Sequence, residues 1–162
     1  TCPASAHPAD GEAVFDRANI EAATGTAVHW LTTERIDGRP HSIEEAVSLH
    51  GGDHDEVQYL SVQAWRSWES IAEYFPHPRQ VEVELEKTFG EVRLTGHVDV
   101  LSEASTVRMC DFKTGRLTED WESQLRGYAW LALQLYPGAE SVWAATVQVR
   151  SETRAELWTR AM

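Results

Sequence analysis

An aspartate and a lysine stand two residues apart at the end of an expected strand, where they could do metal-assisted chemistry. The stretch CDFKTG contains Asp111 and Lys113, and the buried run Val107 to Phe112 leads into it. Side chains two apart on a strand point the same way, so this face begins apolar and ends charged. An isolated Asp-x-Lys is most often a plain ion pair at a strand end. Other parts of the chain must therefore decide its meaning.

A second carboxylate, Asp99, lies in GHVDV on the preceding expected strand. If the two strands form a hairpin with the three-residue loop 104–106, Asp99 falls opposite Asp111, with Cβ atoms about 4.5–5.5 Å apart. Two ionised carboxylates that close repel unless a proton, an arginine or a divalent cation offsets the repulsion. A four-residue loop would instead send them to opposite faces. The register of this hairpin thus decides whether a site exists.

Two further polar motifs lie on expected helices. GTAVH ends in His29, although a lone helical histidine is more often packed or solvated than a ligand. Gly25, one turn earlier, costs a helix about 1 kcal/mol relative to alanine, which indicates that another segment passes close by. QLRGY places Gln124 and Tyr128 on one stripe of a later helix, and we expect that stripe to face the sheet. An inward-pointing Gln124 would need a polar partner.

The segment HGGDHDE, residues 50–56, invites a metal-site interpretation because it crowds histidines and acids together. A helix cap explains it better. Asp53 is a good N-cap residue, Glu56 follows at the third position, and an amphipathic helix comes next. No fixed helical spacing joins His50 and His54 to the acids. We therefore predict a capping loop here.

The periodicity of the chain predicts an α/β layer architecture with a mixed sheet in a single domain, 1–162. Residues 1–16 are expected to be a loose lead-in, and the core to span about 17–150. The expected helices are Arg17 to Arg35, Ile43 to Leu49, His54 to Phe75, where the tryptophans Trp65 and Trp68 favour core packing, and about Thr118 to Tyr136. The expected strands are Val81 to Phe89, Val92 to Leu101, Thr106 to Lys113 and Ser141 to Val149, with weaker alternation over 152–162 that is compatible with an extra strand.

The composition limits the class of protein. No apolar run approaches the roughly 18 residues of a membrane span, and we expect a soluble, cytoplasmic protein. The two cysteines, Cys2 and Cys110, are too few for a four-cysteine iron–sulfur cluster and indicate a reducing compartment.

The net charge of −12 is unfavourable for a protein that grips phosphates. Basic residues nevertheless concentrate between positions 79 and 126, so we expect one basic rim on an otherwise acidic molecule. They are Arg79, Lys87, Arg93, Arg108, Lys113, Arg116 and Arg126.

The four motifs GTAVH, GHVDV, DFKTG and QLRGY, in this order and at these separations, resemble those of the RecB-like branch of the PD-(D/E)xK nuclease superfamily. In that branch they are the ligand histidine, the second-strand aspartate, the (D/E)xK motif and the QxxxY motif. The resemblance covers about residues 20–135 and implies a restriction-endonuclease-like αβββαβ core, a mixed sheet flanked by helices. The chain lacks the cysteine quartet of some branches and any helicase segment. It would therefore be a stand-alone nuclease or a subunit of something larger.

The resemblance also implies a site. It makes His29, Asp99, Asp111 and the backbone carbonyl of Phe112 ligands of Mg²⁺ or Mn²⁺, and the imidazole favours Mn²⁺. Lys113 would orient the attacking water and offset phosphate charge, while Gln124 and Tyr128 would position the Lys113 region and the nucleic-acid backbone. Arg116 and Arg126 are the expected nucleic-acid contacts, and either Glu82 or Glu84 is a weaker candidate for a second metal shell.

The implied activity is metal-dependent hydrolysis of DNA by an exonuclease or structure-specific nuclease acting on ends, flaps, forks or single strands in recombination, repair or replication. A homo-oligomer or a helicase or recombination partner would fit it. Two alternatives stay open: a non-catalytic module that binds DNA ends or a protein, and a metalloenzyme built on His50, Asp53 and His54. Endonuclease or exonuclease action, polarity, DNA or RNA preference and oligomeric state are not determined by the sequence.

Overall fold

The computed structural model describes residues 9–115, 121–150 and 153–159, with side chains over 17–115 and 122–150. Helices α1 (Ala9–Ile36), α2 (Ile43–His50) and α3 (His54–Ile71), followed by the 3₁₀ turn Ala72–Tyr74, precede three strands, β1 (Arg79–Phe89), β2 (Val92–Ser102) and β3 (Thr106–Lys113). Helix α4 (Trp121–Leu135), β4 (Ser141–Gln148) and β5 (Thr153–Thr159) complete the described chain. Within those residues no helix has both the length and the apolarity needed to cross a membrane.

The five strands form one mixed sheet in the order β1-β2-β3-β4-β5. β3 and β4 run parallel because α4 connects them, and the other neighbours are antiparallel. The αβββαβ order and the mixed sheet confirm the predicted α/β fold class.

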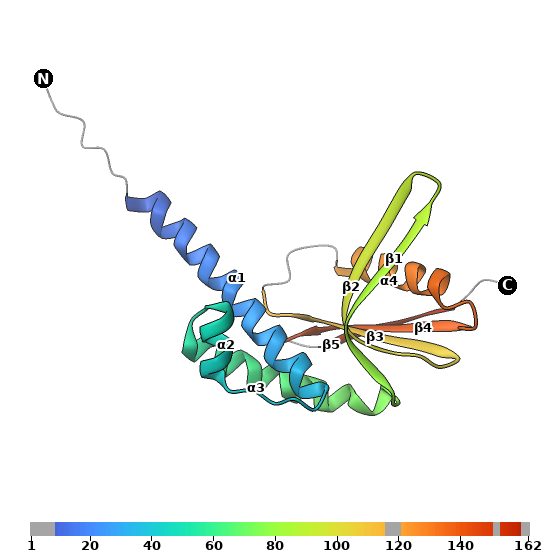
Figure 1. Ribbon diagram of the computed structural model, residues 1–162, viewed down its shortest axis with the longest axis horizontal. Coiled ribbons are helices and arrows are strands. Elements are labelled where there is room, and N and C mark those ends of the chain that lie inside the picture. The colour runs from blue at the N-terminus through green and yellow to red at the C-terminus, as the bar shows by residue number, and fades with distance from the viewer. Residues whose placement is uncertain (1–8, 116–120, 151–152, 160–162) are drawn as a thin grey trace, which may run out of the picture.

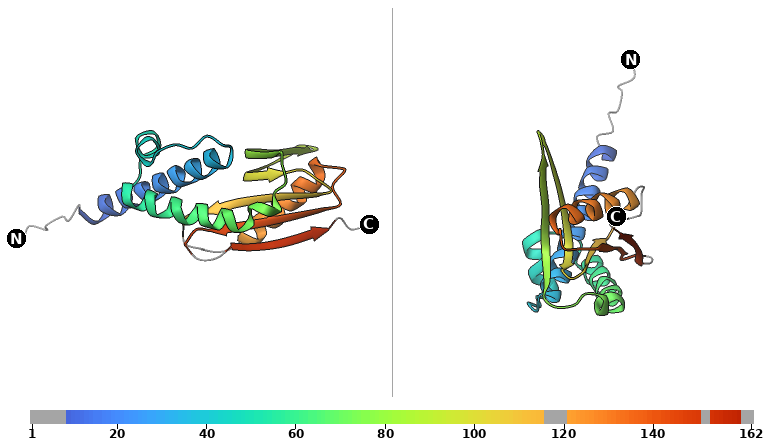
Figure 2. Two further views of the ribbon diagram at one scale, coloured as in Figure 1. Left: turned by 90° about the horizontal axis from the view of Figure 1, so that it is seen from below. Right: turned by 90° about the vertical axis from the view of Figure 1, so that its right-hand side faces the viewer.

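Two helical layers cover the strands on different sides (Figures 1 and 2). Cys110 and Phe112 of β3 pack with α1, α2 and α3 in one apolar cluster. Val107 and Met109 of the same strand pack with Leu125 of α4 in the other. This alternation along β3 buries both of its faces, as expected for a central strand.

The sheet forks between β2 and β3, and this fork positions the site. The β1–β2 ladder is long, but β2 and β3 pair over only three positions, from Val100–Cys110 to Ser102–Arg108. The part of the β1–β2 hairpin that contains residues 92–99 of β2 does not pair with β3, and the hairpin crosses the direction of β3 and β4 at a steep angle (Figure 1). The fork therefore begins at Asp99 on β2 and at Asp111 on β3, the residues next to the last pair, Val100 and Cys110.

The element boundaries deviate from prediction in a few places. Helix α1 begins at Ala9, so half of the predicted lead-in is helical; its alanine and acidic residues favour helix although no apolar stripe marks it. The long helix ends at Ile71 and its last turn tightens to 3₁₀. The hairpin connection is 103–105, one residue earlier than expected, with the predicted register unchanged. The predicted start of the fourth helix near Thr118 lies outside the described residues.

The segment HGGDHDE is a helix cap, as predicted. Asp53 is the N-cap of α3, and its side chain accepts a hydrogen bond of 2.8 Å from the Glu56 N–H. Downstream on α3, Trp68 is buried in the core, while Trp65 is half-buried under the guanidinium of Arg35. These contacts fix α3 against α1, the helix that carries His29.

Candidate metal centre

Asp99 and Asp111 are the first residues beyond the β2–β3 ladder, one on each side of the fork. The pairing of Val100 with Cys110 confirms the predicted register, so the two aspartates lie on the same side of the strand pair. They are 3% and 6% exposed. The ladder ends one residue too early to pair them.

The Asp99 carboxylate occupies the gap that the ending ladder leaves. Its Oδ2 accepts a hydrogen bond of 2.5 Å from the Phe112 N–H, and its Oδ1 lies 3.3 Å from His29 Nδ1. The imidazole of His29 also meets the Phe112 ring edge to face at 6.4 Å between centroids. Helix α1 thus delivers the predicted imidazole to the predicted aspartate.

Gly25 allows α1 to approach this closely. A Cβ at Gly25 would lie 2.8 Å from Thr114 Oγ1, on the segment that leaves β3 after Lys113. The sequence predicted that some segment passes this turn, and the segment is the end of the DFKTG motif itself.

Asp111 faces Lys113, with 2.7 Å between Oδ2 and Nζ. Burial raises the pKa of Asp111 and the charge of Asp99 raises it further, outweighing the opposite effects of Lys113 and His29. Burial lowers the pKa of His29, but the hydrogen bond and charge of Asp99 and the charge of Asp111 together raise it. This buried pair of carboxylates is short of positive charge, which is the condition that a divalent cation relieves.

Glu82 and His97 add two more side chains that could bind a metal ion beside Asp99. One ligand atom from each of Glu82, His97 and Asp99 lies within 4.8 Å of the other two, and His97 Nε2 is 3.3 Å from Glu82 Oε2. Among the described residues this is the one group of three so close together; Asp111, turned towards Lys113, is not within that limit of both His29 and Asp99. The predicted trio of His29, Asp99 and Asp111 stays a prediction.

His97 is a donor that the sequence analysis missed. It stands two residues before Asp99 in GHVDV, and the period of two along a strand was the signal that could have found it. Of the two glutamates considered, Glu82 belongs to the cluster and Glu84 does not.

Gln124 is exposed on α4 and does not point inward as predicted. Its partner is Tyr128, because Gln124 Nε2 donates to the Tyr128 hydroxyl at 2.8 Å. The Tyr128 ring packs directly on Gly96, because a Cβ at that glycine would lie 2.8 Å from two carbons of the ring. The QxxxY motif therefore supports the strand that carries Asp99, and the glycine of GHVDV provides the space.

In the part of the chain that the structure describes, the basic side chains of the expected rim make contacts within the protein. Arg126 pairs with Glu122, and Arg116 lies outside the described residues. The others bond to backbone carbonyls or carboxylates: Arg79 to Phe75 and Ala72, Lys87 to Gln134, Arg93 to Glu86, Arg108 to Thr106, and Lys113 to Asp111.

Gln148 and Arg150 hold the segment after Lys113, a role that the sequence did not indicate. Gln148 Nε2 donates to the Gly115 carbonyl at 2.6 Å, and Arg150 Nε donates to the Thr114 carbonyl at 2.8 Å. The parallel pairing of β3 with β4 brings both residues next to this segment, and sequence periodicity does not reveal that pairing.

Two adjoining cavities border the site. One, of about 560 Å³, is lined by His29, Glu82, His97 and Asp99, and the other, of about 620 Å³, by Arg17 and Arg150; they share Glu21, Gly25, Thr114 and Gly115. The two cavities therefore adjoin in one hollow along α1 and the segment after β3, where Glu82 and Asp99 line one part and Arg17 and Arg150 line the other.

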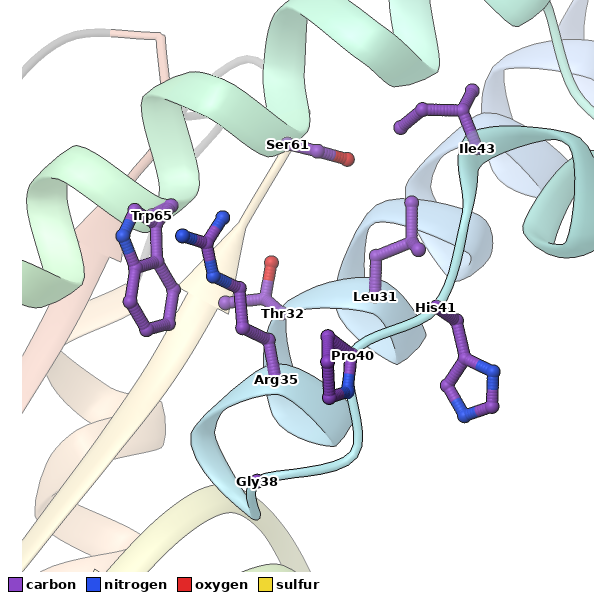
Figure 3. Close-up of a pocket in the computed structure, with 9 residues that line it drawn as sticks. All are labelled: Leu31, Thr32, Arg35, Gly38, Pro40, His41, Ile43, Ser61 and Trp65. Carbon is purple, nitrogen blue, oxygen red and sulfur yellow. The ribbon is translucent and has the colours of Figure 1, made fainter.

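A third cavity, of about 500 Å³, lies between α1, α3 and the loop that joins α1 to α2 (Figure 3). The guanidinium of Arg35 stands 3.8 Å from the ring centroid of Trp65 there. Its lining contains no carboxylate and none of the predicted site residues.

Comparison with known proteins identifies one family model, that of the PD-(D/E)XK nuclease superfamily, which matches residues 1–160. No curated protein matches the chain. Among solved structures, that of SSO0001 is 14% identical with a TM-score of 0.35, and the match covers 88% of this chain and 67% of that one. Protein VC1899 from Vibrio cholerae is 16% identical with a TM-score of 0.39, and the match covers 85% of this chain and 45% of that one.

Proposed function

Because the chain belongs to the PD-(D/E)XK nuclease superfamily, we propose that it is a divalent-metal-dependent nuclease of the RecB-like branch that hydrolyses DNA phosphodiester bonds. The observations that support this most strongly are two contacts beside the fork of the sheet, that of His29 with Asp99 and that of Lys113 with Asp111. Its proposed substrates are ends, flaps, forks and single strands, in recombination, repair or replication.

The donor set at the fork fits a divalent cation. Two buried carboxylates and an imidazole supply the oxygen and nitrogen ligands that Mn²⁺ accepts, and Mg²⁺ would rely more on the carboxylates and water. Burial and the charge of Asp99 raise the pKa of Asp111 although Lys113 lies beside it, so a cation would further stabilise its ionised form. We propose His29, Asp99, Asp111 and the Phe112 carbonyl as ligands. When bound, the cation would supply Lewis-acid neutralisation of the phosphate and activation of water.

Lys113 contributes a fixed positive charge next to Asp111. Its ammonium can leave Asp111 for a phosphate oxygen, where it would neutralise the charge that develops in the transition state and orient the attacking water. Val149 N–H donates to the Lys113 carbonyl at 3.0 Å, and this bond fixes the lysine backbone at the end of the strand. Gln124 and Tyr128 would support β2, the strand that carries Asp99, because Gln124 bonds to the Tyr128 hydroxyl and the Tyr128 ring packs on Gly96.

The hollow that leads away from the carboxylates supports a nucleic-acid strand as substrate. Arg17 and Arg150 line its far part, and both are held in ion pairs, with Glu21 and Glu56, that a phosphate could replace. The net charge of −12 and the internal pairing of the described basic residues between positions 79 and 126 disfavour wide contacts on intact duplex. Local contact with a strand end or a single strand is the mode that this charge distribution favours.

Metal-dependent cleavage is the direct test. End-labelled single-stranded, duplex and forked DNA, and RNA of the same sequence, are incubated with the protein and Mg²⁺ or Mn²⁺. We expect products with single-stranded or forked DNA that disappear with EDTA, with Asp111→Asn and with Lys113→Met. Absence of cleavage by the unaltered protein on every substrate would contradict the proposal.

A binding module on the nuclease fold is the second candidate, because the described lysines and arginines of positions 79–126 are already paired and the chain is strongly acidic. It predicts DNA-end or protein binding that Asp111→Asn leaves unchanged. We propose a reducing, cytoplasmic compartment for either candidate, consistent with the buried and free Cys110, and a homo-oligomer or helicase partner as the larger assembly.

A further inference from the structure

We propose that the cavity between α1, α3 and the loop joining α1 to α2 binds the free C-terminus of a peptide whose last residue is aliphatic (Figure 3). Its volume of about 500 Å³ is in the range of sites for small ligands and short chain ends. Its lining contains none of the residues proposed for the metal centre, so the inference is independent of the proposed nuclease.

Arg35 supplies a cation that has no anionic partner. Its guanidinium lies 3.8 Å from the Trp65 ring centroid and makes no ion pair or hydrogen bond with the residues that the structure describes. The nearby acids have other partners, because Glu34 binds Arg39 and Glu69 accepts from Trp65 Nε1. Stacking on an indole fixes the guanidinium plane and leaves its N–H edge available to a carboxylate.

Ser61 adds a donor that also lacks a partner. Its Oγ is buried, lines the same cavity and has no hydrogen-bond partner among the described residues. Buried hydroxyls are normally bonded, so this one points to a ligand acceptor. The Thr32 hydroxyl, also in the lining, donates to the Val28 carbonyl at 2.7 Å, and its oxygen can still accept a hydrogen bond.

These groups match the parts of a peptide end. A terminal carboxylate has two oxygens, which suit the guanidinium fork of Arg35 and the Ser61 hydroxyl. The last amide N–H suits the Thr32 oxygen. Leu31, Pro40 and Ile43 line the rest of the cavity and would contact an aliphatic side chain.

The charges around the cavity disfavour a nucleic-acid strand there. Besides Arg35, the one basic ring in the lining is that of His41, which already faces Glu34 at 3.3 Å and Glu45 at 3.4 Å. A strand with a phosphate at every nucleotide would meet these acids, whereas a single carboxylate needs only Arg35.

Isothermal titration with acetylated glycyl-alanyl-leucine tests the site. The peptide with a free carboxylate should bind roughly 10–100-fold more tightly than the same peptide with a C-terminal amide, because hydrogen bonds to a charged group are lost in the amide. Arg35→Gln should abolish this difference, and Arg35→Lys should restore only part of it. Arg66→Gln removes the same charge from an exposed position of α3 outside the lining, and this matched control should bind normally.

Ser61→Ala separates binding from folding, since it leaves the Arg35–Trp65 stack in place. Removal of a buried hydroxyl without a partner should not lower the Tm, but it should weaken binding of the free-acid peptide. Equal binding of acid and amide, or an acid preference that survives Arg35→Gln, would overturn the site. Tighter binding of thymidylate would identify a phosphate site instead, and equally tight binding of isocaproate, which has no amide, would reject a peptide as the ligand.

Discussion

Histidines and acids gather in two regions of this molecule, and the two differ in how the fold uses them. In residues 50–56 they are neighbours in sequence, but Asp53 caps α3 and the exposed His54 faces Glu44 and Asp55. At the fork, His29 of α1, Glu82 of β1 and His97 of β2 gather around one buried carboxylate, Asp99, while Asp111 of β3 faces Lys113. Density of donors along the sequence therefore says less about a metal site than strand register does.

The difference has a physical origin in burial. A solvated cap residue keeps its charge at little cost, because water and the helix N-terminus compensate it. Asp99 and Asp111 have lost most of their water, so each needs a specific partner, and Lys113 and the Phe112 N–H satisfy them only in part. The fork is thus the region where an added cation gains most.

The replacement Asp111→Asn should separate the two regions most clearly. Transition-state stabilisation by a metal amounts to several kcal/mol, so cleavage should fall by at least about 100-fold, measured under single-turnover conditions. Asp55→Asn, which changes an exposed acid of the cap region, is the control and should retain full activity.

The same replacement should stabilise the metal-free protein at neutral pH. The pKa of Asp111 is raised on folding, so its ionised form disfavours the folded state at every pH above its folded pKa, and the penalty vanishes below the unfolded value near 3.8. Thermal unfolding in EDTA should show a higher Tm for the variant at pH 7 and a difference that shrinks on acidification. A lower Tm at pH 7 would contradict the account of the fork as a centre of uncompensated charge.

Gly96→Ala should disturb the fork through packing alone. The new Cβ would lie 2.8 Å from ring carbons of Tyr128, and overpacking of this kind costs about 1–3 kcal/mol. Chemical denaturation should show the loss, and Mn²⁺ affinity should fall with it because β2 carries Asp99 and His97. Gly127→Ala on α4 is the matched control: nothing lies within 4 Å of its Cβ position, and alanine should stabilise the helix by up to about 1 kcal/mol.

These expectations show which features the sequence could predict. Alternation along 81–113 predicted three strands, and the three-residue loop assumed between the second and third strands predicted the register that the pairing of Val100 with Cys110 confirms. Gly25 predicted a close approach and the structure shows Thr114 there. The family motifs predicted His29 beside Asp99, and the two are in contact.

Other features depend on three-dimensional facts that no local pattern carries. The β2–β3 ladder ends at Val100, so Asp111 turns to Lys113 and Glu82 with His97 fill the space near Asp99. The roles of Gln148 and Arg150 depend on the parallel pairing of β3 with β4, about 35 residues apart in sequence. The internal pairing of the basic residues depends on side-chain reach and could not be foreseen from charge counts.

Asp53→Ala should affect the cap region without affecting the fork. Loss of the hydrogen bond to the Glu56 N–H costs a helix about 1 kcal/mol, which urea denaturation can resolve. Mn²⁺ binding per folded molecule should be unchanged. A loss of metal binding larger than the loss of folded protein would show that the two regions are coupled through α3.

His54→Gln should have the smallest effect, and it discriminates most directly between the two histidine regions. The exposed ring stands 3.7 Å from Glu44 and 3.4 Å from Asp55, and surface pairs of this kind contribute roughly 0–1 kcal/mol. Mn²⁺ titration and cleavage should therefore match the unaltered protein, whereas His97→Gln should lower Mn²⁺ affinity. Should His54→Gln abolish Mn²⁺ binding while His97→Gln preserves it, the metal would belong to the cap segment and the fork would be only a charged junction in the sheet.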